Sequence, residues 1–128
     1  MSDIESTKVL VVDDEESIRL SLTAFLDDLD YNVVSVDSAE KALDILKDQS
    51  FHIAIVDLRL PVMSGDAMIL EANKIIPSLK YIIHTGSVGY NPSDNLKAIG
   101  ISSKNVIFKP IHNLEIITEA IEKLLKNQ

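Results

Sequence analysis

Short apolar runs punctuate the chain, and longer segments with a helical repeat lie between them. Residues 9–12, 53–56 and 81–83 are apolar throughout, which is typical of strands that helices cover on both faces of a parallel sheet. Residues 31–36 are more mixed and residues 106–108 form only a short run, so we expect these two strands at the flanks of the sheet. The repeated alternation of strand and helix predicts a parallel sheet.

Four of the intervening segments repeat apolar residues at spacings of three and four, which places them on one face of a helix. These positions are Ile18, Leu22, Phe25, Leu26 and Leu29; Ala39, Ala42, Leu43 and Leu46; Met68, Leu70, Ala72, Ile75 and Ile76; and Leu114, Ile117, Ile121, Leu124 and Leu125. Asp37 and Glu40 have the spacing of a capping box, and Asn91 is a cap residue ahead of a first-turn proline, so helices are predicted to start there. Five strand–helix units predict an α/β fold, a three-layer, doubly wound sheet of five parallel strands.

The length and composition fit one globular domain. The chain has 128 residues, of which 46% are hydrophobic and 25% charged, a balance that supports a sizeable core and lies far from that of disordered chains. We expect a polar tail over residues 1–7 and a single domain over residues 8–128, with no room for a second functional module.

The charge and the missing cysteines exclude several classes of function. The 20 acidic residues outnumber the 12 basic ones, which gives a net charge of −8 and opposes direct binding to nucleic acid or anionic lipid. The absence of cysteine excludes a disulfide framework, a cysteine zinc site and a thiol nucleophile. The polar start of the chain is unlike a signal peptide, and no apolar run approaches the about 20 residues that span a bilayer. We therefore expect a cytoplasmic protein that contacts neither nucleic acid nor membrane.

Polar residues follow four of the five predicted strands. Asp13 and Asp14 come after the first strand, Asp57 after the third, Thr85 after the fourth and Lys109 after the fifth. Ligand sites of doubly wound sheets lie at the carboxyl ends of the strands, so these side chains are predicted to converge. Taken singly, each has an ordinary structural explanation; the acidic run that Asp13 begins, for example, suits the start of a helix.

The crowding of the three carboxylates predicts a metal site. Two unit charges about 4 Å apart repel by on the order of 4 kcal/mol at an effective dielectric constant near 20, and this repulsion must be offset. Mg²⁺, or Mn²⁺ in its place, suits a site of carboxylates, a carbonyl and water, and Lys109 adds a positive charge. Adjacent residues of a strand point to opposite faces, so of Asp13 and Asp14 we expect one to bind the ion directly and the other through water.

Four motifs in order resemble the receiver domain of response regulators, the phosphoacceptor module of two-component signalling. They are residues 11–15, 56–65, 85–86 and 108–110, and the resemblance extends from Lys8 to about Leu125. It implies a flavodoxin-like sheet with the strand order 2-1-3-4-5. It also implies a cis peptide bond between the lysine and the proline of the last motif.

The resemblance implies a role for each polar residue at this edge. Asp57 is the residue that is phosphorylated. The implied metal ligands are Asp14, Asp57 and the backbone carbonyl of Arg59, with Asp13 acting through water. Thr85 and Lys109 bind the phosphoryl oxygens, and the small Gly86 keeps the phosphoryl group accessible. These roles suit phosphoryl transfer, which needs an in-line nucleophile and compensation of the charge on the equatorial oxygens.

The resemblance implies a signalling switch rather than a metabolic enzyme. Such a domain catalyses only its own phosphorylation and the slow loss of the phosphoryl group. The implied partners are a sensor histidine kinase or a histidine phosphotransfer protein. A homodimer through the face of the fourth helix, fifth strand and fifth helix is a further candidate.

The chain departs from the family pattern near the fifth strand. Receivers commonly carry tyrosine or phenylalanine three residues before the lysine, as a side chain that moves on activation, whereas this chain has Val106. Phe108, on the same face of the strand, is the candidate substitute. Residues 100–105 form a connection about two residues longer than usual, which surface loops tolerate. His84 is expected to be a packed or partly exposed histidine rather than a metal or phosphate ligand, because strand alternation turns it away from Thr85.

Three alternatives remain open on the sequence. A phosphatase with an aspartate nucleophile would share the position of Asp57, but it requires a second acid two residues later, where Arg59 stands. A nucleotide-binding domain requires a glycine-rich turn after the first strand, where this chain has Asp13 and Asp14. A degenerate receiver that serves only protein contacts is disfavoured because all five polar positions are present.

Overall fold

The five predicted strands form one parallel sheet. The computed structural model describes residues 6–126 of the chain. The strands are β1 (Lys8–Val12), β2 (Asn32–Val36), β3 (Ile53–Val56), β4 (Lys80–Thr85) and β5 (Val106–Phe108). Their order across the sheet is β2-β1-β3-β4-β5, and every neighbouring pair is parallel, which confirms the predicted fold class and order.

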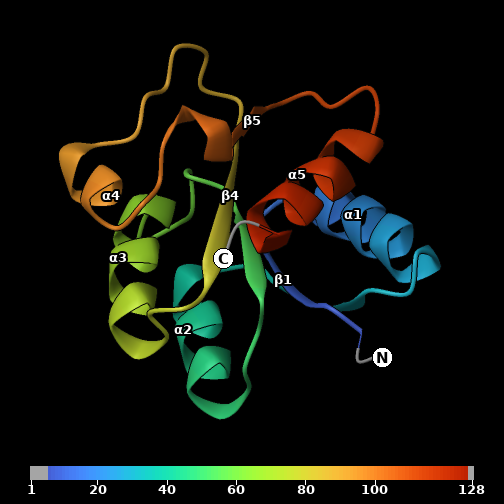
Figure 1. The fold of residues 1–128 in the computed structure, drawn as a ribbon, viewed down its shortest axis with the longest axis horizontal. Coiled ribbons are helices and arrows are strands. Elements are labelled where there is room, and N and C mark those ends of the chain that lie inside the picture. The colour runs from blue at the N-terminus through green and yellow to red at the C-terminus, as the bar shows by residue number, and fades with distance from the viewer. Residues whose placement is uncertain (1–5, 127–128) are drawn as a thin grey trace.

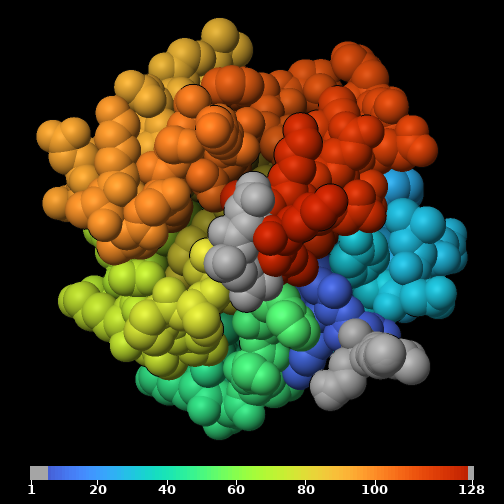
Figure 2. Space-filling model, in the orientation of Figure 1, coloured from blue at the N-terminus to red at the C-terminus, as the bar shows by residue number. Residues whose placement is uncertain are grey.

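Helices cover both faces of this sheet. They are α1 (Glu16–Asp28), α2 (Ala39–Asp48), α3 (Gly65–Ile75), α4 (Asp94–Ala98) and α5 (Glu115–Lys126), with a 3-10 turn, η1 (Ser103–Asn105), before β5. Figure 1 shows α1 and α5 on one face and α2, α3 and α4 on the other, so the chain has the predicted three layers. In the space-filling view, the surface of α5 lies against that of α1 and the residues after it (Figure 2).

Strand alternation divides the core into two parts. Val9 and Val11 of β1 belong to the cluster under α1 and α5, whereas Leu10 and Val12 belong to the cluster under α2, α3 and α4. All four side chains are fully buried. Burial on both faces explains why the central strands have uninterrupted apolar sequences, because no position in them faces water.

Two helix starts differ in detail from the prediction. Ser38, rather than Asp37, caps α2: its hydroxyl accepts from the backbone N–H of Lys41 at 3.2 Å, and Asp37 instead pairs with the Lys41 ammonium at 3.0 Å. Ser93, rather than Asn91, caps α4. Both serines directly precede the first helical residue with extended backbone angles, which is the geometry that lets a short hydroxyl reach the first turn.

The connection before β5 has a structure of its own. Within residues 100–105, η1 is closed by a reciprocal capping box between Ser102 and Asn105. The Asn105 amide also donates to the backbone carbonyl of Tyr81 in β4 at 2.8 Å, which ties this connection to the sheet. Lys109 then follows β5 directly, and its peptide bond to Pro110 is cis, as expected from the resemblance.

The described residues bear on the predicted boundaries only in part. Residues 1–5 of the predicted polar tail and residues 127–128 of the predicted domain lie outside them, and β1 begins at Lys8. The division at residue 8 therefore stays a prediction. Over residues 6–126, the helices are too short or too polar for any of them to cross a membrane.

Candidate phosphoacceptor site

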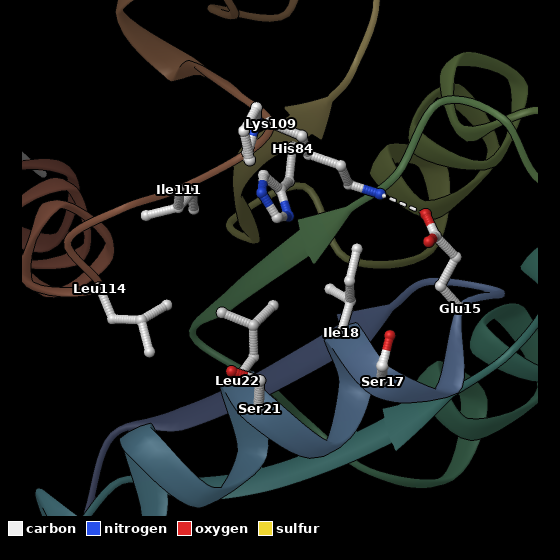
Figure 3. A pocket seen from close by; sticks show the side chains of 10 residues that line it. Glu15, Ser17, Ile18, Ser21, Leu22, His84, Lys109, Ile111 and Leu114 are labelled. Atoms are coloured by element: carbon white, nitrogen blue, oxygen red, sulfur yellow. Dashed lines mark hydrogen bonds and ion pairs between the residues drawn. The ribbon is translucent and has the colours of Figure 1, made fainter.

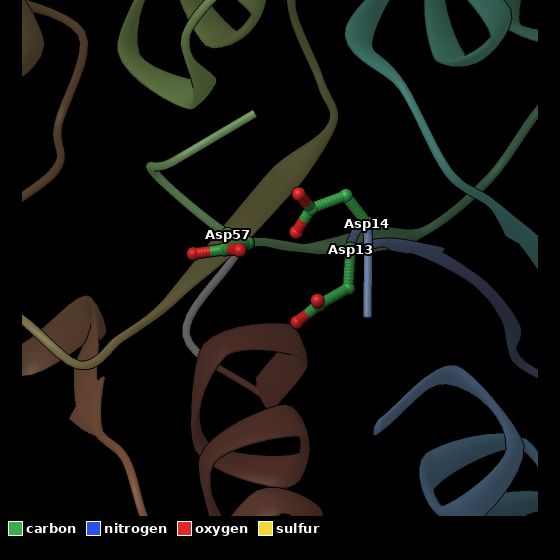
Figure 4. A group of neighbouring side chains, drawn as sticks. All are labelled: Asp13, Asp14 and Asp57. Atoms are coloured by element: carbon green, nitrogen blue, oxygen red, sulfur yellow. The ribbon is translucent and has the colours of Figure 1, made fainter. Parts of the chain in front are cut away.

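Three aspartates meet where β1 and β3 end. The parallel ladder runs one residue past both strands, because the backbone N–H of Asp57 donates to the carbonyl of Val12 at 2.9 Å and that of Asp13 donates to Val36 at 3.2 Å. Asp13 and Asp57 are buried and Asp14 is exposed. The three side chains project from neighbouring strand ends (Figure 4), and each offers a carboxylate oxygen within 4.8 Å of the others.

Lys109 brings a positive charge to this cluster from β5. Its backbone N–H donates to the carbonyl of Thr85 at 2.7 Å, which fixes its position beside β4. Its Nζ lies 3.1 Å from Asp13 Oδ2, 3.6 Å from Asp57 Oδ2 and 3.3 Å from Glu15 Oε1. The sequence predicts the convergence on the aspartates but not the contact with Glu15, because an acidic run suits the start of a helix.

The electrostatics of the site follow from burial and from excess negative charge. Burial raises the pKa of Asp57, and the neighbouring charges of Asp13 and Asp14 raise it further, while Lys109 opposes them. Burial alone would lower the pKa of Lys109, but its hydrogen bonds and charge contacts with Asp13, Asp57 and Glu15 outweigh burial and raise it. One ammonium thus faces more carboxylates than it can neutralise.

The acidic cluster fits a hard divalent cation. Carboxylate oxygens are the donors that such ions prefer, and three aspartates supply them from within 4.8 Å of one another. A pocket of about 390 Å³ opens over the cluster, and Arg59, Gly86 and Lys109 line it together with Asp14, Glu15 and Asp57. Arg59 is therefore at the site, although the part played by its carbonyl stays a prediction.

Thr85 and Gly86 stand at the end of β4 beside this pocket. Thr85 is fully buried, and its hydroxyl accepts from the backbone N–H of Ser87 at 3.0 Å. The hydroxyl proton remains able to donate to a phosphoryl oxygen. Gly86 lines the pocket, and a methyl group in its place would have no atom within 4 Å, so this side of the pocket is open.

The two proposed switch residues lie on one face of β5 but differ in exposure. Val106 is half-buried and packs against the cluster under α2, α3 and α4. Phe108 is 44% exposed. Neither position tests whether an aromatic side chain moves on activation, so that role stays a prediction.

Gly65, the last residue of the motif at residues 56–65, has a part in the site that the sequence alone does not indicate. It begins α3, and its backbone N–H donates to the carbonyl of Leu58 at 2.9 Å. A Cβ atom at this position would collide with the backbone carbonyl oxygen of Asp57 and come within 2.9 Å of the Leu58 Cα. The loop after β3 thus packs so closely on the start of α3 that only glycine fits, and this contact sets where Asp57 stands.

Comparison with known proteins agrees with this geometry. Residues 9–122 match the family model of the response regulator receiver domain. The response regulator receiver protein CpdR of Brucella abortus is 28% identical over 120 residues, which cover 92% of this chain and 96% of CpdR. The cell cycle response regulator CtrA of Brucella ovis is 27% identical over 110 residues, 86% of this chain; the match covers 47% of CtrA, so the chain spans about half of that relative's length.

Solved structures show the same relationship. A CheY-like receiver domain protein from Methanospirillum hungatei matches with a TM-score of 0.84 and 28% identity, over 96% of both chains. The response regulator TrrA of Thermotoga maritima, solved in complex with Mg(2+)-BeF, matches with a TM-score of 0.81 and 27% identity, over 93% of this chain and 99% of TrrA. The family model matches most of the chain, and the fold agrees with that of solved receiver domains. This chain therefore belongs to the response regulator receiver domain family, a signalling module of two-component systems.

Proposed function

We propose that this chain is a phosphoacceptor that receives a phosphoryl group on Asp57 from the phosphohistidine of a sensor histidine kinase or a histidine phosphotransfer protein. The observation that carries the proposal is the position of Lys109, whose Nζ lies 3.6 Å from Asp57 Oδ2 at a pocket of about 390 Å³. A nucleophilic carboxylate, a cation beside it and open space before it are the parts that phosphoryl transfer requires.

The acidic cluster would hold Mg²⁺ or Mn²⁺ in this reaction. Asp14, Asp57 and the carbonyl of Arg59 are the proposed direct ligands, and Asp13 is the proposed ligand through water. The bound ion supplies positive charge that offsets the crowded carboxylates and the oxygens of the transferred group. The excess of negative charge around a single ammonium supports this assignment.

The chain's own residues account for the rest of the transfer. An Asp57 oxygen forms a bond to phosphorus as the bond from phosphorus to the donor imidazole nitrogen breaks, so the donor recovers its nitrogen lone pair. The Lys109 ammonium exchanges one of its aspartate contacts for a contact with a phosphoryl oxygen. The Thr85 hydroxyl donates a hydrogen bond to a second phosphoryl oxygen. In dephosphorylation, a water oxygen forms a bond to the same phosphorus through the side that Gly86 leaves open. The bond from phosphorus to the Asp57 oxygen breaks, which releases inorganic phosphate and a proton and restores the Asp57 carboxylate.

The proposed switch links Thr85 to the loop between β4 and α4. Its hydroxyl accepts from the Ser87 backbone in the loop between β4 and α4, so a new bond to a phosphoryl oxygen would act on this loop. We place a candidate homodimer contact on the face of α4, β5 and α5, where Phe108 and Ile116 are 44% and 45% exposed. Exposed apolar side chains on this face support a protein contact there.

Acetyl phosphate tests the proposed function without the cognate kinase. The protein, incubated with acetyl phosphate and Mg²⁺, is expected to gain the mass of one phosphoryl group and to gain none when EDTA removes the metal. Intact-mass spectrometry measures both results. A protein that gains no mass, or that gains it equally with EDTA, contradicts the proposed reaction.

Mg²⁺ is expected to stabilise the folded chain, because the ion relieves repulsion that exists only in the folded state. A tenfold excess of Mg²⁺ over its Kd adds about 1.4 kcal/mol to the free energy of unfolding, which corresponds to a rise of about 5 °C in Tm. Asp14→Ala should remove most of this rise, whereas Asp28→Ala, at an exposed position in α1, should retain it. Thermal melts with and without Mg²⁺ measure the difference, and a full response in Asp14→Ala would show that the ligand is misplaced.

A further inference from the structure

A second pocket lies between α1 and the start of α5, on the opposite side of β4 from α3. Its volume is about 430 Å³, within the range of small-molecule sites. Ile18 and Leu22 of α1 form one apolar wall, and Ile111 and Leu114, which precede α5, form the other. We call this space the α1–α5 pocket; Figure 3 shows the imidazole of His84 from β4 between its two walls.

His84 is the unusual member of this pocket. The residue is 4% exposed, and neither Nδ1 nor Nε2 has a hydrogen-bond partner. Burial and, to a smaller extent, the nearby charge of Lys109 lower the pKa of His84 to about 4, although Glu15 opposes them. The ring is therefore neutral at neutral pH, so one nitrogen is an unused donor and the other an unused acceptor. Buried polar groups of this kind destabilise the folded state until a partner satisfies them.

The positive charge at the pocket is already paired with carboxylates. Lys109 lines its inner end, but the ammonium contacts Asp13, Asp57 and Glu15, so it has no excess positive charge to offer an anion. The remaining polar lining includes the hydroxyl groups of Ser17 and Ser21, which are neutral. An anionic ligand would lose hydration without gaining a counter-ion, and a cationic ligand would have to compete with Lys109 for Glu15. An uncharged ligand avoids both penalties.

Access to the imidazole nitrogens requires a small change in the pocket wall. Both nitrogens are covered by neighbouring side chains. Ile111 belongs to the segment between β5 and α5, outside helix and strand, and it is only partly buried where it packs on the cluster under α1 and α5, so its side chain is freer to rotate than that of the buried Leu22. A ligand that satisfies a buried, unpaired nitrogen recovers the hydrogen bond that the free protein lacks, which compensates for this rotation.

We propose that the α1–α5 pocket binds a small uncharged molecule that has an apolar body and a hydroxyl or amide group, with the body between Ile18, Leu22 and Ile111 and the polar group hydrogen-bonded to His84. The pocket is separate from the one over the acidic cluster, although Glu15 and Lys109 line both. The proposal does not depend on phosphorylation, so its test can fail while the proposed function stands.

Phenol and toluene are matched probes for this proposal, because they have the same number of heavy atoms and only phenol carries a hydroxyl. Phenol, titrated into ¹⁵N-labelled protein, should shift the amide signals of residues in α1, at the end of β4 and near Ile111. In His84→Phe, the ratio of phenol affinity to toluene affinity should fall about tenfold, since the ring shape remains and both nitrogens are lost. His112 is exposed in the segment between β5 and α5, next to Ile111, and His112→Phe should leave the ratio of affinities unchanged.

A second variant, Ser21→Trp, tests the pocket without changing His84, in case His84→Phe disturbs the local fold. Ser21 lies at an exposed position of α1 on the pocket, so Ser21→Trp should cover the pocket and abolish the phenol shifts while the other amide signals stay in place. The absence of localised shifts in the unmodified protein would overturn the site. An equal ratio of affinities in the unmodified protein and His84→Phe would overturn the role of His84.

Discussion

Asp57→Asn is expected to abolish the gain of a phosphoryl group from acetyl phosphate while the fold stays intact. The amide has nearly the shape of the carboxylate but lacks its nucleophilic charge. The three described carboxylates of the cluster differ in their surroundings, and Asp57 alone stands at the end of the central strand β3 with Lys109 at 3.6 Å. Asp13 instead forms the shorter contact with Lys109, at 3.1 Å, and is more deeply buried.

The same variant is expected to be more stable than the unmodified protein when Mg²⁺ is absent. Burial and the charge of Asp13 raise the pKa of Asp57 in the folded state, so ionisation of Asp57 destabilises that state. The loss of stability begins as pH rises through the carboxyl pKa of the unfolded chain, about 3.9, and is complete above the raised pKa of the folded state. The advantage of Asp57→Asn should therefore be present at neutral pH and vanish below the unfolded-state pKa.

Intact-mass spectrometry and thermal melts at several pH values check both parts of this expectation. Asp28→Asn makes the same chemical change at an exposed position in α1 and should alter neither phosphorylation nor Tm. An equal gain of mass in Asp57→Asn and the unmodified protein would place the phosphoryl group on another residue. A variant that is less stable at neutral pH would show that the contact with Lys109 outweighs burial and repulsion.

The parallel sheet and its central strands could be predicted because those strands are apolar at every position, whereas the order of the strands was implied by the family resemblance. Every residue from Val9 to Val12 is buried. A run without polar positions is typical of a strand that helices cover on both faces. The helix caps were predicted less well, since Asp37 and Ser38 are both good cap residues and only the local backbone angles decide between them. The error was one residue for α2 and two for α4.

The candidate site could be predicted where it depends on topology alone. Parallel strands bring their carboxyl ends to one edge, so Asp13, Asp14 and Asp57 had to approach one another, and the structure places their oxygens within 4.8 Å. The contact between Lys109 and Glu15 depends on the path of the loop before α1, which the strand pattern does not specify. The unpaired nitrogens of His84 likewise depend on which side chains surround it.

Gly65→Ala is expected to destabilise the chain by about 3 kcal/mol, at the upper end of what an extra methyl group does in a packed interior. The new Cβ atom would collide with the carbonyl oxygen of Asp57 and lie within 2.9 Å of the Leu58 Cα, and neither backbone atom can move as the end of a flexible side chain can. Gly86→Ala is the matched control: it adds the same methyl group to a glycine of the same site, where no atom lies within 4 Å, and should change stability by less than about 0.5 kcal/mol. Urea unfolding measures both variants.

Gly65→Ala should also slow phosphorylation in molecules that remain folded, because relief of the collision must displace Asp57. A variant with normal stability and normal phosphorylation would show that this contact does not hold the loop after β3.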